Sequence, residues 1–139
     1  MIVLADTNIL LDVIQDRKPF SDPAARVWKL VEAGELVGYV SAISFNNVFY
    51  VERKNVGFDK ALAEIRAIHA VFRTVPLDDP VIDRALAVPG SDFEDGIQAA
   101  AAIRIAADYL VTRDARDFDA MGVRSVTAVE LLAVLLPGP

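Results

Sequence analysis

Aspartates recur in this chain of 139 residues where apolar runs end or where an alanine-rich helical pattern begins. The residues concerned are Asp6, Asp92, Asp95, Asp114 and Asp117. If the apolar runs are parallel strands, their carboxyl ends share one edge of a sheet, where open α/β folds bind ligands. Clustered carboxylates repel one another and resist desolvation unless a cation lies among them, and Mg²⁺ and Mn²⁺ prefer such oxygen ligands. The pattern therefore predicts a divalent-metal site at the edge of a sheet.

Each of these acids also has a simpler interpretation. Asp6 can be a helix N-cap, because Asp favours that position. Asp92 and Asp95 are three residues apart, so they can share one helix face, and a helix dipole stabilises a negative charge near its N-terminus by roughly 0.3–1 kcal/mol. Asp95 lies inside the predicted first turn, which makes it a better ligand candidate than a capping residue. Neither interpretation explains why acids of separate segments coincide at strand ends.

Polar residues beside the acids could orient them. Thr7 and Asn8 follow Asp6 and could hydrogen-bond to its carboxylate or to the terminus of the following helix. Thr112 ends the run before Asp114 and could orient a water molecule or a phosphate oxygen. We therefore treat Asn8 and Thr112 as auxiliary site residues.

The segment after the last apolar run offers two acids and two bases. Asp114 is nearer to the strand end and is the expected ligand, whereas Asp117 could instead begin a short helix with Phe118 in the core. Arg113 and Arg116 flank the acids and could contact phosphates. For most other basic residues of the chain we expect solvated surface positions.

Composition predicts one domain over residues 1–139, because the length fits the usual range of about 100–200 residues for a domain. The sequence is 54% hydrophobic, which is ample for one packed core. With 14 basic and 20 acidic residues, the net charge is −6. This argues against a broad basic surface for nonspecific nucleic-acid binding, but bound metal ions would reverse the potential locally.

Disulfides and thiolate metal sites are excluded, because the chain has no cysteine, and the single His69 argues against a His-rich zinc site. The apolar run 2–5 is too short for a secretory signal, and Asp6 interrupts it. No uninterrupted apolar stretch reaches the roughly 18–20 residues of a membrane span. The sequence therefore predicts a cytoplasmic protein without a membrane segment.

Short β-like runs alternate with helical patterns, which is typical of βαβ units and of an α/β fold. Strands are predicted at 2–5, 37–40, 73–76, 109–112 and 124–126. Asp-Pro pairs at 22–23 and 79–80 predict helix starts, the first of these helices ending near Gly34. Apolar residues three or four apart predict a helix over 58–72. Further helices are predicted from a capping box at 91–94 and over about 127–135.

Together these motifs resemble the PIN-domain nuclease family, particularly its small single-domain group that includes VapC-type toxins. The resemblance runs almost from end to end, and the order and spacing of its motifs are more specific than any one of them. It implies a three-layer α/β/α fold with a central parallel sheet of about five strands. The motifs are Asp6-Thr7-Asn8, Ser41-Ala42-Ile43, Asp92-Phe93-Glu94-Asp95, and Thr112-Arg113-Asp114 with Asp117-Phe118.

By this resemblance Asp6, Asp95 and Asp114 fall on the metal-binding catalytic acids, with Asp92 and Asp117 as auxiliaries. Family members typically use Mg²⁺ or Mn²⁺ to cleave RNA, by in-line attack of a metal-activated water on phosphorus. The resemblance also implies a homodimer and often a cognate antitoxin, whose basic segment would suit an acidic pocket. We therefore expect a metal-dependent endoribonuclease that is the toxin of a type II toxin–antitoxin pair.

One position departs from the family pattern. Active members usually carry Glu on the helix after the second strand, and Asn47 aligns with that position. Asn can coordinate through its carbonyl, but it brings no charge and cannot act as a base, so weaker binding of a second metal is expected. A subgroup of the family resembles this chain in having Asn there. Glu52 lies too far round the helix to substitute, whereas Glu94 is nearer in the motif.

Two other functions compete with the nuclease. Asn47 favours a catalytically impaired PIN-like module that binds RNA or protein without turnover. Asp6 after a strand is also compatible with an aspartyl phosphotransferase of the haloacid dehalogenase type. That family has a second Asp two residues later, where this chain has Asn8.

Overall fold

The computed structural model describes residues 1–88 and 92–136, without the side chain of Asp117. Its centre is a sheet of five parallel strands in the order β3-β2-β1-β4-β5. The predicted parallel sheet is confirmed, and every strand bound lies within one residue of its prediction. The strands are β1 (Ile2–Ala5), β2 (Val37–Ser41), β3 (Arg73–Val75), β4 (Tyr109–Val111) and β5 (Ser125–Val126).

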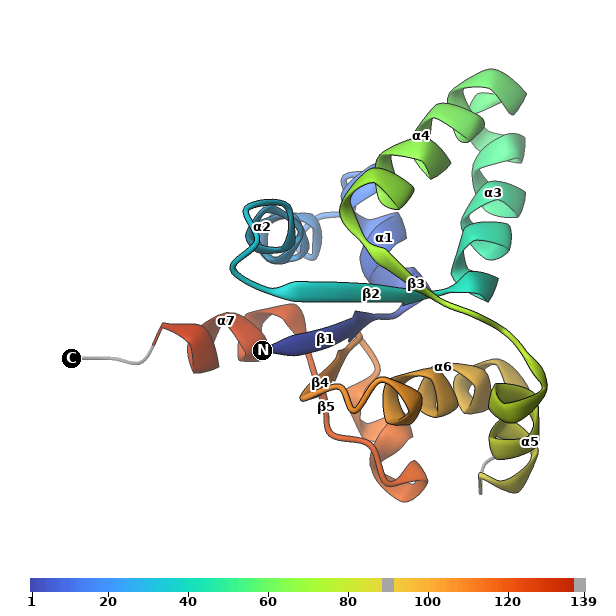
Figure 1. Cartoon of the computed structure of the whole chain (residues 1–139). Helices are drawn as coiled ribbons and strands as arrows, with labels where there is room; N and C mark the ends of the chain where they lie inside the picture. Colours follow the sequence, from blue (N-terminus) through green and yellow to red (C-terminus); the bar gives the residue numbers. More distant parts are fainter. Residues whose placement is uncertain (89–91, 137–139) are drawn as a thin grey trace.

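Helices cover both faces of the sheet, so the fold has the predicted α/β/α layers (Figure 1). One face carries α1 (Thr7–Ile14), α2 (Ser21–Glu32), α3 (Ala42–Val56), α4 (Phe58–Val71) and α7 (Ala128–Leu135). The other face carries α5 (Asp79–Ala87), α6 (Phe93–Arg104) and the 3-10 helix η1 (Ala115–Met121). Within the described ranges, no helix is both long and apolar enough to cross a membrane.

Alternating side chains of the central strand build a separate core on each face of the sheet. Val3 and Ala5 pack into the cluster beneath α1 and α2, whereas Leu4 packs into the opposite cluster with Leu110 and Phe118. Successive side chains of a strand point to opposite faces, and a parallel sheet covered by helices buries both. This is why the apolar run at the start of the chain is continuous.

Two helix starts differ from the predictions. Helix α2 begins after Phe20, which makes no side-chain cap, so the predicted N-cap Asp22 lies inside the first turn. Helix α5 is capped by Asp78 rather than by Asp79, because the Asp78 carboxylate accepts the hydrogen bond from the helix. Either of two adjacent aspartates can cap a helix, and the backbone path decides between them.

Candidate metal centre at the carboxyl edge of the sheet

Asp6 directly follows β1 and has an extended backbone (φ −68°, ψ 157°) as the N-cap of α1. Its side chain is buried, with 7% of the residue exposed. The Oδ1 atom accepts a hydrogen bond of 2.7 Å from the backbone N–H of Thr7, and Oδ2 accepts one of 2.9 Å from the Thr112 hydroxyl. The carboxylate therefore caps the helix and also faces the next strand, so both predicted roles are compatible.

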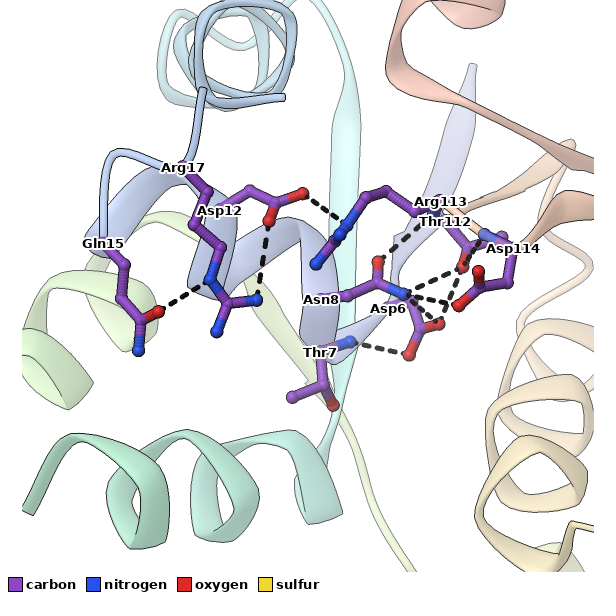
Figure 2. A network of polar contacts seen from close by, with 9 residues as sticks. All are labelled: Asp6, Thr7, Asn8, Asp12, Gln15, Arg17, Thr112, Arg113 and Asp114. Atoms are coloured by element: carbon purple, nitrogen blue, oxygen red, sulfur yellow. Dashed lines mark hydrogen bonds and ion pairs between the residues drawn. The ribbon is translucent and has the colours of Figure 1, made fainter. Parts of the chain in front are cut away.

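Asn8 lies between Asp6, which follows β1, and Asp114, which follows β4 (Figure 2). Its Nδ2 lies 3.4 Å from Asp6 Oδ2, 3.4 Å from Asp114 Oδ2 and 3.3 Å from Thr112 Oγ1. The backbone N–H of Asp114 also donates to Thr112 Oγ1, over 3.1 Å. Strands β1 and β4 are paired with Ala5 opposite Val111, which places these side chains side by side. The predicted convergence at the strand ends is present for Asp6 and Asp114.

Asp92 and Asp95, the acids that precede the alanine-rich stretch, lie at the start of α6. Asp92 is the N-cap, and its Oδ1 accepts hydrogen bonds from the backbone N–H groups of Glu94 (2.9 Å) and Asp95 (3.2 Å). Asp95 is half-buried in the first turn, as its position in the sequence predicted. Ser91, which was expected to begin a capping box, lies outside the described residues. Asp92 thus orients the turn that carries Glu94 and Asp95.

A buried polar contact fixes α6 against the elements that carry the other site residues. Gln98 Nε2 donates a hydrogen bond of 3.0 Å to Ser44 Oγ on α3, and that hydroxyl lies 2.9 Å from Thr7 Oγ1 on α1. A Cβ atom at Gly96 would lie 3.2 Å from the carbonyl oxygen of Ala85, so glycine lets α6 approach α5 closely. These contacts hold the first turn of α6 in a fixed relation to Asp6. Sequence reasoning missed Gln98, although a polar residue within an alanine-rich stretch was a signal.

Asn47 lies on α3, one turn after Ser44, and contacts a carboxylate of α6. Its Nδ2 donates a hydrogen bond of 2.7 Å to Glu94 Oε1. The residue that departs from the family pattern therefore pairs with the acid that the sequence motif placed nearest to it. Glu52 is buried farther along α3 and accepts a hydrogen bond of 2.7 Å from Gln15 instead.

Burial raises the pKa of Asp6 to about 6. The hydrogen bonds from Thr112 and Thr7 lower it in part, while the carboxylates of Glu94 and Asp114 raise it further. The charges of Glu94 and Asp114, which come from separate segments, therefore act on the carboxylate of Asp6. No Lys or Arg among the described residues forms a salt bridge with any of them. A divalent cation would remove this repulsion.

The side chains suit a hard divalent ion by type, but they are not arranged as a complete ligand set. In the described part of the chain, no three Asp, Glu, His or Cys side chains already surround one point. The amide of Asn8 lies instead between Asp6 and Asp114, with its N–H groups directed at both. Carboxylate and amide oxygens are the ligands that Mg²⁺ and Mn²⁺ prefer. These residues can hold such an ion once the Asn8 amide moves out from between the Asp6 and Asp114 carboxylates.

Arg113 pairs with an acid that sequence reasoning overlooked. Its Nε lies 3.0 Å from Oδ2 of the fully buried Asp12, and its guanidinium stacks 4.5 Å from the centre of the Phe20 ring. Arg17 lies 3.7 Å from the other Asp12 oxygen. Figure 2 shows the Arg113 side chain directed at Asp12. The sequence signal was a charged residue inside the apolar stretch 9–14, because buried charges are almost always paired.

The two remaining predicted residues lie in or next to the first turn of η1. Arg116 is exposed to solvent, and its predicted contact with phosphate stays a prediction. Asp117 belongs to the backbone of η1, but its side chain lies outside the described part of the structure. Phe118 is buried in the core, as expected of a helix that packs beneath the site.

Comparison with known proteins supplies a family. A family model described as PIN domain matches residues 2–116 of this sequence. No curated protein matches the sequence significantly.

Solved structures with a similar fold include three that cover nearly the whole chain. VapBC2 from Rickettsia felis, bound to a promoter DNA fragment, has a TM-score of 0.74 at 16% identity, covering 91% of this chain and 98% of its own. A toxin–antitoxin complex from Klebsiella pneumoniae has a TM-score of 0.68 at 23% identity, covering 91% and 97%. VapC20 from Mycobacterium tuberculosis, described as a sarcin-ricin loop cleaving toxin, has a TM-score of 0.69 at 18% identity, covering 87% and 95%. At these identities the likeness is one of fold.

Proposed function

Because the chain belongs to the PIN domain family, we propose that it is a metal-dependent endoribonuclease and the toxin of a type II toxin–antitoxin pair. One observation carries the proposal. The carboxylates of Asp6 and Asp114 lie on either side of the Asn8 amide, each 3.4 Å from its nitrogen, and no salt bridge among the described residues neutralises either acid. A divalent cation would stabilise such a cluster. The fold of a toxin described as cleaving the sarcin-ricin loop supports RNA as the substrate.

Asp6, Asp95 and Asp114 are the proposed ligands of Mg²⁺ or Mn²⁺ and the proposed catalytic residues. When bound, the ion would lower the pKa of a water molecule and stabilise charge on the scissile phosphate. Asn8 contacts both the Asp6 and the Asp114 carboxylates, whereas Thr112 donates to the Asp6 carboxylate and accepts from the Asp114 backbone N–H.

The other residues of the proposed site have supporting roles. Asp92 caps α6 and thereby presents Asp95, while Asp117 remains an auxiliary ligand candidate. Arg116 is exposed next to the acids and suits an RNA phosphate. Arg113 is better suited to holding the strand end in place, because Asp12 occupies its guanidinium.

A cognate antitoxin, a homodimer and a cytoplasmic location belong to the same proposal. The toxin–antitoxin complexes of similar fold support the first partner. A basic segment of the antitoxin would complement the acidic edge that carries Asp6 and Asp114. Light scattering is expected to give the mass of two chains. A single-chain mass, together with no basic protein retained on the purified chain, would count against these partners.

Cleavage of a mixed-sequence, fluorescently labelled RNA and of a folded tRNA tests the activity. We expect products with Mg²⁺ or Mn²⁺ and none after chelation of the metal with EDTA. A pure, folded protein that leaves both RNAs intact in both ions contradicts the proposed activity.

A second candidate function is a PIN-like binding module without turnover, which Asn47 favours because it replaces a family acid. Such a module would retain labelled RNA or a protein in a binding assay while leaving the RNA intact. It would also bind equally well after Asp6→Asn, since no reaction would depend on that carboxylate. Because the chain belongs to the PIN domain family, the haloacid dehalogenase alternative, which rested on an aspartate directly after a strand, is set aside.

A further inference from the structure

A hydrogen bond of 2.7 Å from Asn47 Nδ2 to Glu94 Oε1 joins α3 to α6 at the candidate metal centre, in addition to the contact of Gln98 with Ser44. Asn47 occupies the α3 position at which the resemblance places an acid. We propose that Glu94 supplies this missing carboxylate to the metal from α6, and that Asn47 is the residue that positions it. This inference rests on the proposed metal-dependent function.

The side chains at positions 47 and 94 can form this hydrogen bond without charge repulsion because one is an amide and the other a carboxylate. A glutamate at position 47 would bring a second carboxylate within hydrogen-bond distance of Glu94, and like charges that close disfavour ionisation of both. The amide of Asn47 carries no charge and instead donates a hydrogen bond to the Glu94 carboxylate. One negative charge is thereby moved from α3 to α6, and the number of charges facing Asp6 need not fall.

The packing of α6 against α1 and α3 turns Glu94 toward the candidate metal centre. Gln98 lies one helical turn after Glu94 on the same face of α6, and its Nε2 donates a hydrogen bond of 3.0 Å to Ser44 Oγ. That hydroxyl lies 2.9 Å from Thr7 Oγ1, and Thr7 directly follows Asp6. Glu94 is therefore on the side of α6 that faces Asp6.

The hydrogen bond also restricts a side chain that would otherwise be mobile. Glu94 is exposed, and an exposed glutamate loses rotamer freedom when it binds a metal. Asn47 fixes its carboxylate in advance, while the backbone N–H of Glu94 is held by Asp92. A glutamate that served only the helix dipole would need neither constraint, because that effect depends on its place in the first turn.

Titration of the full chain with Mn²⁺ by isothermal calorimetry tests this assignment without relying on activity. Glu94→Gln is expected to weaken Mn²⁺ binding about tenfold or more, as the loss of a group that holds or orients a metal ligand does. Asn47→Ala should cause a smaller loss, since it frees the carboxylate without removing it. The exchange variant Asn47→Glu with Glu94→Gln returns the charge to α3 and should restore the affinity.

Matched variants separate the failure of this inference from the failure of the proposed function. Asp59→Asn removes an exposed acid from the first turn of α4, beyond the far end of α3, and should bind Mn²⁺ as wild type does. Asp6→Asn should abolish binding. If Glu94→Gln binds like wild type while Asp6→Asn does not, or if the exchange variant stays as weak as Glu94→Gln, the inference is overturned and the metal site stands. A wild type that neither binds Mn²⁺ nor cleaves RNA overturns both.

Folding of each variant is checked by its thermal midpoint. Glu94 is exposed, so Glu94→Gln is expected to melt as wild type does. Glu94→Ala is the second variant that removes the carboxylate. Equal losses of Mn²⁺ affinity in the two variants at an unchanged midpoint support the assignment, and unchanged affinity in both contradicts it.

Discussion

The Thr112 hydroxyl donates a hydrogen bond of 2.9 Å to Asp6 Oδ2 and so joins the residues that directly follow β4 and β1. The same hydroxyl accepts from Asn8 Nδ2 over 3.3 Å and from the backbone N–H of Asp114 over 3.1 Å. Thr112 is fully buried, so no water molecule can replace these contacts without a rearrangement. One hydroxyl thus sets the relative positions of two proposed metal ligands.

Removing this hydroxyl tests its positioning role. Thr112→Val is expected to weaken Mn²⁺ binding about tenfold, because the Asp6 carboxylate and the Asp114 backbone N–H lose their common partner. It should also lower the free energy of unfolding by about 1–3 kcal/mol, since a buried carboxylate loses a donor. Calorimetric titration and urea unfolding measure the two effects. Thr74→Val, on the exposed face of β3, is the matched control, and equal results for both variants would refute the role of Thr112.

The ion pair of Asp12 and Arg113 is expected to stabilise the fold, and removing Arg113 should cost more stability than neutralising Asp12. Arg113→Met leaves the fully buried Asp12 carboxylate with Arg17, at 3.7 Å, as its one basic partner among the described residues, and should cost about 3–5 kcal/mol of stability. Asp12→Asn should cost less, because the Arg113 side chain is 32% exposed and can reach water. Urea unfolding of both variants measures the difference.

Arg116→Met is the control for Arg113→Met, because it removes an exposed base from the same segment. We expect a change of within about 0.5 kcal/mol in its free energy of unfolding. If Arg113→Met is as stable as this control but binds RNA more weakly, then Arg113 contacts phosphate and the structural role assigned to it is wrong.

Stability is expected to fall between about pH 4.5 and 7 because of Glu64. Burial and the neighbouring carboxylate of Glu52 raise the pKa of Glu64 from 4.5 to about 7. The folded chain therefore holds this proton more tightly than the unfolded chain, so the contribution is complete below about pH 4.5 and is lost as the pH rises through 7. Unfolding by urea at a series of pH values should show wild type losing stability relative to Glu64→Gln.

The control for this pH dependence is Glu35→Gln, which removes an exposed acid from the turn after α2. It should follow the wild-type pH curve, apart from a small constant offset. Parallel curves for wild type and Glu64→Gln would show that Glu64 titrates normally in the folded protein.

The acids at the strand ends could be predicted from the sequence because their positions depend on local patterns. A continuous apolar run marks a buried parallel strand, and parallel strands share an edge, so Asp6 and Asp114 could be placed together. The start of α6 could also be predicted from the sequence, because an aspartate before an alanine-rich stretch marks a helix start. The contact of Asn8 with Asp114 was not predicted, since the sequence does not reveal which strands are neighbours.

The buried ionisable pairs could not be predicted. Asp12 meets Arg113 across about a hundred residues, and Glu52 faces Glu64 across the α3–α4 hairpin. Which residues meet depends on how helices pack on the sheet, and no local spacing records that. Glu52 lies too far round its helix to take part in the metal site, and its contacts with Gln15 and Glu64 explain instead why an acid is buried there.

The measurement that tests the central claim most directly is metal-dependent cleavage of one labelled RNA by wild type, Asp6→Asn and Asp95→Asn. Asp59→Asn serves as the control, because it removes the same charge from the first turn of a different helix. We predict cleavage in Mn²⁺ by wild type and the control, with loss of product of at least about a hundredfold in both site variants. Cleavage by Asp6→Asn at the wild-type rate would contradict a catalytic metal centre at this edge of the sheet.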